Sequence, residues 1–157
     1  MAFVTAALFA ALSYVAHFQL APSVGGQIIL DLRPFGYDSN AAQAFRDALN
    51  FESETLYLRT YLPIDFFFIA ALTGLLFLLS KEAGSYVSRM CILMLAVGFM
   101  VSDIVENWVV HGLLTKPTLE TDLVSMASML TQGKFACLLS VLVVLVFAWM
   151  KSRPHEG

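Results

Sequence analysis

Four long apolar runs, separated by shorter polar stretches, set the hydrophobic pattern of the chain. The hydrocarbon core of a bilayer takes about 20 residues of helix to cross, so each run is long enough for a membrane-spanning helix. Because the last three runs follow one another closely, we expect them to pack as one domain over residues 1–157. The pattern predicts an all-α integral membrane protein, a four-helix bundle with spans at residues 2–20, 62–79, 90–114 and 123–149.

The first run has a second reading as a cleaved secretory signal. Its core, "MAFVTAALFAALSYVA", is typical of such signals, but no Lys or Arg precedes the apolar residues. The end of the run, "FQLAPS", lacks the small-x-small pattern of a cleavage site. We therefore expect this run to be retained as the first span, with a cleaved signal as the alternative.

The loop at residues 21–61 contains its own helical pattern. "PFGYDSN" is a turn cluster, and Ser39 is predicted to cap a helix through "AAQAFRDALNFESETLYL", with Asp38 near its positive end. Ala42, Phe45 and Leu49 recur at helical spacing and form an apolar face. Two placements stay open: a short helix on the outer membrane surface, or a loop helix packed on the bundle.

Composition supports the membrane assignment and removes one class of partner. The chain is 59% hydrophobic and 13% charged, with a mean hydropathy of +0.76, whereas a soluble domain is roughly half apolar and about a quarter charged. A net charge of -3 offers no basic surface, so nucleic acid is not expected as a partner. Cys91 and Cys137 lie at heights that differ by ~17 Å, beyond the reach of a disulfide.

The orientation follows from Lys and Arg residues near the ends of the spans. Lys81 and Arg89 flank the second loop, and Lys151 and Arg153 lie in the C-terminal tail. Such residues mark the cytoplasmic side, which places both termini inside. The first loop holds more acidic than basic residues and is placed outside.

Each predicted span carries an ionisable residue at nearly the same depth. Measured along the helix from the cytoplasmic end, Asp103 lies at ~21 Å, Asp65 at about 22 Å, and Lys134 and His17 at ~24 Å. These heights fall in the outer third of a core roughly 30 Å thick. An unpaired charge there costs at least ~2.5–3.5 kcal/mol, so we expect Lys134 to pair with Asp103, with Asp65 as a second partner.

The stretch "VSDIVENWVVHGLL" at residues 101–114 adds three more polar residues to this layer. Asp103, Asn107 and His111 are spaced i, i+4, i+8 and form one stripe, with Glu106 beside it. We expect these side chains to face the bundle interior or a cavity that opens outward.

The same residues also have purely structural readings. Asp65 follows Pro63 in the first turn of the predicted second span, where a carboxylate interacts favourably with the positive end of the helix dipole. The pair of Lys134 and Asp103 can fix helix register, and His17 can be a hydrogen-bonded packing residue. The outer residues of the third span can reach interfacial water. A polar site is favoured because all these readings would have to hold together at one depth.

Three short motifs carry a resemblance. "YLPID" at 61–65, "DIVEN" at 103–107 and "FGYDSNAAQAF" at 35–45 are similar to uncharacterised small four-helix bacterial inner-membrane proteins that carry an Asp-x-x-Glu-Asn motif on the third helix. The resemblance covers most of the chain and implies a bacterial four-span bundle. It implies no particular chemistry, and no P-loop, GxGxxG, HExxH, CxxC or GxSxG motif is present.

Two functions of different class follow. The first is a non-catalytic accessory, assembly or small-ligand-binding protein, with membrane lipid, a larger membrane complex or homo-oligomer, or an amphiphilic small molecule as partner. The second is a membrane enzyme for a lipid-soluble substrate, with Asp103 and Glu106 as an acid–base pair and His17 or His111 as proton shuttle. No cofactor is identified. His17, His111, Glu106 and Asp103 are suitable metal ligands, but they are too dispersed for a metal site to be assigned.

Overall fold

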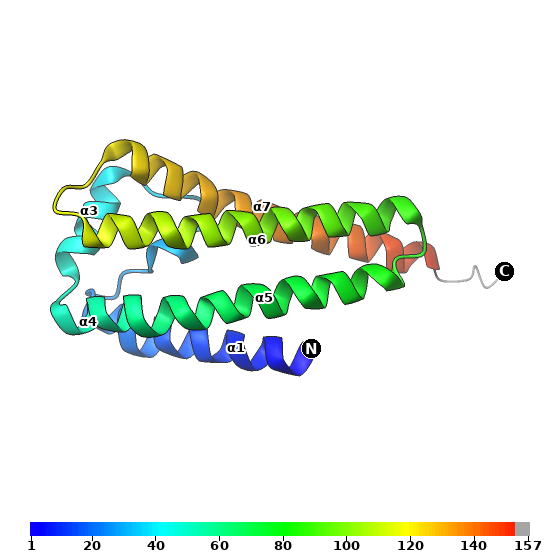
Figure 1. Cartoon of the computed structure of the whole chain (residues 1–157), viewed down its shortest axis with the longest axis horizontal. Coiled ribbons are helices and arrows are strands. Elements are labelled where there is room, and N and C mark those ends of the chain that lie inside the picture. Colours follow the sequence, from blue (N-terminus) through cyan, green and yellow to red (C-terminus); the bar gives the residue numbers. More distant parts are fainter. Residues whose placement is uncertain (153–157) are drawn as a thin grey trace.

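The computed structural model describes residues 1–152 as long antiparallel helices joined into one bundle (Figure 1). Within this part of the chain, four helical segments are long and apolar enough to cross a membrane: Ala2–Ser23, Phe51–Glu82, Tyr86–Thr115 and Thr121–Lys151. The chain is therefore an all-helical, multi-pass membrane protein, as the hydrophobic pattern predicts. Arg153, used above for the orientation, lies outside the described residues.

Shorter elements make up the spans and the first loop. The first span consists of α1 (Ala2–Tyr14), the π-helical η1 (Val15–Leu20) and α2 (Ala21–Ser23). The loop holds the 3-10 turn η2 (Leu30–Leu32) and α3 (Ser39–Ala48). The second span consists of α4 (Phe51–Leu56), the π-helical η3 (Tyr57–Tyr61), α5 (Leu62–Leu79) and the 3-10 turn η4 (Ser80–Glu82). The last two spans are α6 (Tyr86–Thr115) and α7 (Thr121–Ser152).

Neighbouring spans in the sequence are neighbours in space: α1 packs on α5, α5 on α6, and α6 on α7. We call the end that carries α3, α4 and the connection between α6 and α7 the loop end, and the end with the turn between α5 and α6 the turn end (Figure 1). Much of the apolar surface remains exposed, as expected when the surrounding solvent is lipid.

The second span starts much earlier than its apolar run predicts. Asn50 caps α4 in a reciprocal arrangement: its Oδ1 accepts from the Ser53 N–H at 2.8 Å, and Ser53 Oγ accepts from the Asn50 N–H at 2.9 Å. The helical path then continues without a break through η3 into α5. Asp65 therefore lies about four turns inside a continuous helix, and the helix-dipole reading of this residue is wrong.

The predicted loop helix is two helices with a different cap. Asp38, and not Ser39, caps α3 by accepting from the Ala41 N–H at 2.8 Å. The helix ends at Ala48, because Asn50 has an extended backbone and its side chain caps the N-terminus of α4. Phe45 is fully buried and packs against the ring of Tyr57. The apolar face of α3 is thus covered by the bundle, which decides for the packed loop helix and against the membrane-surface helix.

Residues 24–38, here called the loop insert, enter the bundle instead of covering its end. Its turn η2 packs on α6 and α7, and Leu30 and Asp31 are buried. Gly36 adopts a φ of +79°, and a Cβ at this position would lie 2.6 Å from Ser128 Oγ. The insert can therefore approach α7 this closely only with glycine at position 36.

Candidate ligand-binding site in the bundle

Five ionisable side chains meet inside the loop end of the bundle, and we call them the charge cluster. All are buried, with exposures between 0% and 6%: Asp31, Asp65, Asp103, Glu106 and Lys134. They come from the loop insert, α5, α6 and α7. The cluster contains four carboxyl groups and a single ammonium group, so acidic groups outnumber basic groups.

Lys134 lies between two carboxylates of α6. Its Nζ is 2.7 Å from Asp103 Oδ1 and 2.9 Å from Glu106 Oε2. The first contact is the pair that the depth comparison predicts. The second arises because Asp103 and Glu106, three residues apart, share one face of the helix. Glu106 also accepts a hydrogen bond from Thr131 Oγ1, which is itself buried.

Asp65 is held by an amide and not by the lysine. Asn107 Nδ2 donates to Asp65 Oδ2 at 2.6 Å, which joins α6 to α5. The ion pairs of Lys134 go to Asp103 and Glu106, so the second predicted partnership, between Lys134 and Asp65, is not formed. The amide preserves a polar contact at the predicted depth without neutralising the carboxylate.

Asp31 is the cluster member that the polar layer predicted from the sequence lacks, because it lies in the first loop and outside the predicted spans. Its two carboxylate oxygens accept from Tyr57 Oη at 3.0 Å and from Tyr61 Oη at 2.8 Å, and both rings are buried. A usable signal was present: Asp31 interrupts the apolar run "IILDL", which is bounded by turn residues. A short apolar segment in a loop is typical of a segment that packs inside.

The loop insert that brings in Asp31 is held by hydrogen bonds within itself and by one hydrogen bond to α7. Arg33 donates through Nε and Nη2 to the carbonyl of Ile28, at 2.9 and 2.7 Å. The Tyr37 N–H donates to Ser128 Oγ of α7 at 2.8 Å. Burial, together with the nearby charge of Glu106, raises the pKa of the Tyr37 phenol well above its usual value, so this group stays neutral.

A cavity of about 440 Å³ lies against the charge cluster. Asp31, Asp65, Asp103 and Lys134 line it, together with Tyr61 and a set of apolar side chains from five elements: Phe9, Leu12, Leu32, Phe68, Phe99, Phe135 and Leu138. Glu106 is not among the lining residues. His17, Ile28 and Pro34 also line the cavity and are exposed, so it opens to the surface between α1 and the loop insert.

The cavity is polar toward the loop end and apolar toward the turn end. On each of three helices, a charged lining residue has an apolar lining residue about one turn further toward the turn end. These pairs are Asp65 and Phe68 on α5, Asp103 and Phe99 on α6, and Lys134 and Leu138 on α7. Figure 1 shows that α5 and α6 run in opposite directions. For this reason Phe68 comes after Asp65 in the sequence, whereas Phe99 comes before Asp103.

The structure brings together most of the predicted polar layer but not all of it. Lys134 binds Asp103 and Glu106, and Asn107 binds Asp65, so these residues form two bonded sets inside the loop end. His17 lies at the cavity rim, with Nδ1 3.1 Å from the carbonyl of Ser13. His111 is exposed and lines no part of the cavity, although it shares the predicted stripe. Within residues 1–152, no three His, Cys, Asp or Glu side chains are placed to hold a metal ion.

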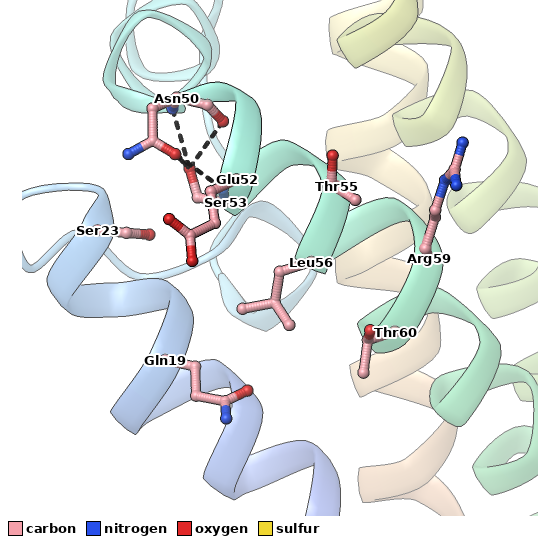
Figure 2. A pocket seen from close by; sticks show the side chains of 9 residues that line it. All are labelled: Gln19, Ser23, Asn50, Glu52, Ser53, Thr55, Leu56, Arg59 and Thr60. Atoms are coloured by element: carbon pink, nitrogen blue, oxygen red, sulfur yellow. Dashed lines mark hydrogen bonds between the residues drawn. The ribbon is translucent and has the colours of Figure 1, made fainter.

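A second hollow, of about 560 Å³, lies at the surface of the loop end between η1, α2 and the start of the second span. Figure 2 shows its lining, in which Asn50 and Ser53 bond to each other as the cap of α4. Glu52 and Arg59 also line it, but both are exposed. No member of the charge cluster reaches this hollow, so the cavity inside the bundle is the better candidate site.

Comparison of the chain with protein-family models, with curated proteins and with solved structures finds no match.

Proposed function

We propose that this multi-pass protein binds one lipid-soluble amphiphile inside its bundle, as a non-catalytic ligand-binding protein of a bacterial inner membrane. The observation that carries the proposal is a cavity of about 440 Å³ with charged groups toward one end and aromatic and aliphatic groups toward the other. Small-molecule pockets of roughly 300–1,000 Å³, mostly apolar with a few convergent polar groups, are typical of binding sites.

The size of the cavity limits what it can enclose. At about 30 Å³ for each non-hydrogen atom, the share of a water molecule in the liquid, it holds on the order of 15 such atoms. That is a polar head with a short length of chain. The exposed ring of Phe9 lies at the apolar end of the lining. A longer tail would leave past Phe9 into the surrounding lipid.

The enzyme alternative has less support. It requires Asp103 and Glu106 to act together on a substrate, but only Asp103 lines the cavity, and Glu106 is fully buried behind it. Both carboxylates are already bound to Lys134. An accessory or assembly role would use the exterior of the protein, and no feature of the charge cluster requires it.

The proposed orientation places the loop end outside the cell and both termini in the cytoplasm. Lys81 and Arg89 flank the turn between α5 and α6 at the turn end, and Lys151 closes α7 at the same end. The positive-inside rule supports a cytoplasmic turn end. The polar end of the cavity would then lie nearer the outer face of the membrane.

The test is native mass spectrometry of the protein extracted gently from its own membrane. We expect one small molecule for each chain, lost in Ser13→Leu, because Ser13 lines the cavity and leucine would fill part of it. Ser140→Leu is the matched control, since it makes the same change on an exposed face of α7. A ligand that survives Ser13→Leu, or a stoichiometric protein partner in place of a ligand, would contradict the proposal.

A further inference from the structure

The charge balance of the cavity wall indicates the chemistry of its occupant. Three carboxyl groups line the cavity, those of Asp31, Asp65 and Asp103, against the single ammonium group of Lys134. That ammonium group already bridges Asp103 and Glu106. An anionic head would have to break these ion pairs and approach three acidic groups, so the wall disfavours acids and phosphates.

Two carboxylate oxygens of the residues that line this wall accept no hydrogen bond from the described part of the chain. Asp65 accepts from Asn107 through Oδ2, and Asp103 accepts from Lys134 through Oδ1. Among the bonds made within residues 1–152, none reaches Asp65 Oδ1 or Asp103 Oδ2. Both side chains are at least nine-tenths buried and line the cavity. Both oxygens are therefore free to accept from an occupant of the cavity, and a charged donor would form charge-assisted hydrogen bonds with them.

From these observations we infer that the ligand is a cationic amphiphile, a protonated primary or secondary amine on an apolar tail, whose N–H groups bind Asp65 and Asp103. This inference rests on the proposed function. An ammonium group supplies both the positive charge that the cluster lacks and up to three N–H donors. A hydroxyl head supplies a donor without charge, and a quaternary ammonium supplies charge without a donor. The tail lies among Phe68, Phe99 and Leu138.

The experiment compares three probes of ten carbons each: decylamine, decanol and decanoate. Each is added at equal concentration, near neutral pH, to the detergent-solubilised protein stripped of its own ligand, and the probe retained by each chain is counted by native mass spectrometry. We expect decylamine to bind at least about tenfold more tightly than decanol, the effect of one charge-assisted hydrogen bond, and decanoate not to be retained.

Asp65→Asn locates the preference at this site. Asparagine keeps one oxygen that can accept from Asn107, but it replaces the other oxygen with an NH2 group. The ligand therefore loses a charge and an acceptor, and decylamine affinity should fall at least about tenfold. Asp47→Asn is the matched control, because Asp47 is exposed and also accepts from an amide, Gln43 Nε2, at 2.6 Å. It should leave the preference for the amine unchanged. If Asp65→Asn does not fold, the order of affinity of the three probes for the parent protein still tests whether the site prefers an amine.

The outcomes separate this inference from the proposed function. Equal binding of amine and alcohol, both lost in Ser13→Leu, would overturn the amine head and support the cavity as a binding site. Preferential retention of decanoate would also overturn the inference and make Lys134 an anion receptor. If no probe is retained, the amine inference fails, and loss or retention of the native ligand in Ser13→Leu decides the proposed function separately.

Discussion

The two ends of the bundle are packed by different chemistry. At the turn end, a small all-apolar cluster of Leu76, Ile92, Ala96 and Val141 joins α5, α6 and α7. At the loop end, the first span, the loop insert and α3 join the other helices around a larger core that adjoins the charge cluster and the cavity. The turn end therefore has what a span in lipid needs, whereas the loop end also has buried charges that spanning a membrane does not require.

This difference indicates that the function of the protein depends on the loop end. Helices that only cross a bilayer gain nothing from buried carboxylates, which are expensive in hydrocarbon unless paired or hydrogen-bonded. The loop insert adds Asp31 to the cluster, and two tyrosines of η3 satisfy its carboxylate. The polar interior is thus assembled from three spans and a loop, and changes at the two ends should have different consequences.

The largest effect is expected for Lys134→Met. It strands Asp103 and Glu106 without their shared ammonium group, and breaking a buried ion pair costs about 3–5 kcal/mol of folding free energy. Lys116→Met is the control: Lys116 is 2.9 Å from Glu120, but the side chains are 46% and 54% exposed, so about 0–1 kcal/mol is at stake. Thermal unfolding in detergent measures both. If Lys134→Met unfolds at the temperature of the parent protein, the cluster is not held together by this pair.

A single type of change, Thr→Val, distinguishes the two ends. Thr131→Val at the loop end removes the hydroxyl donor of Glu106 and should cost about 1–3 kcal/mol, because a buried carboxylate loses a partner. Thr73→Val lies toward the turn end and removes a buried hydroxyl that has no partner among the described residues. That change should be neutral or slightly stabilising. Chemical unfolding of both variants checks the pair, and equal destabilisation would contradict the contrast.

A smaller effect is expected for Gly36→Ala in the loop insert. The positive φ of Gly36 and the close approach of α7 should make alanine cost about 1–2 kcal/mol. Gly84→Ala, in the turn between α5 and α6, meets no atom within 4 Å, and its φ is not positive, so stability should stay equal or rise by about 0.4–1 kcal/mol. Hydrogen exchange of the loop insert would show where the first variant loosens. Unchanged protection there would indicate that the insert does not depend on glycine.

Depth along a helix could be predicted from the sequence, but rotation about its axis could not. Asp103 and Lys134 have matching heights because the rise for each residue is constant, and they do form an ion pair. His111 was grouped with Asp103 by its spacing, yet eight residues rotate it by about 80°. The buried face of α6 passes through Asp103, Glu106 and Val110, so His111 is exposed. Only packing against α5 and α7 decides which face is buried.

In the first loop too, some features follow from the local sequence and others only from tertiary packing. Local chemistry predicts that a helix starts near Asp38 and Ser39, since short polar side chains satisfy the free N–H groups there. It does not reveal that Asn50 starts a new helix that continues into the second span, because that choice depends on the whole packed segment. The entry of residues 24–38 into the bundle depends on contacts with α6 and α7, which are distant in the sequence.

The amino-acid sequence by itself determined the number of helices long and apolar enough to span a membrane and the matching heights of Asp103 and Lys134. Run length, helix rise and bilayer thickness are enough for these properties. The tertiary structure alone decided that Asp31 joins the cluster, that Lys134 also binds Glu106, and that a cavity remains beside them. These features depend on helix rotation and on a loop path set by long-range packing, which no local pattern encodes.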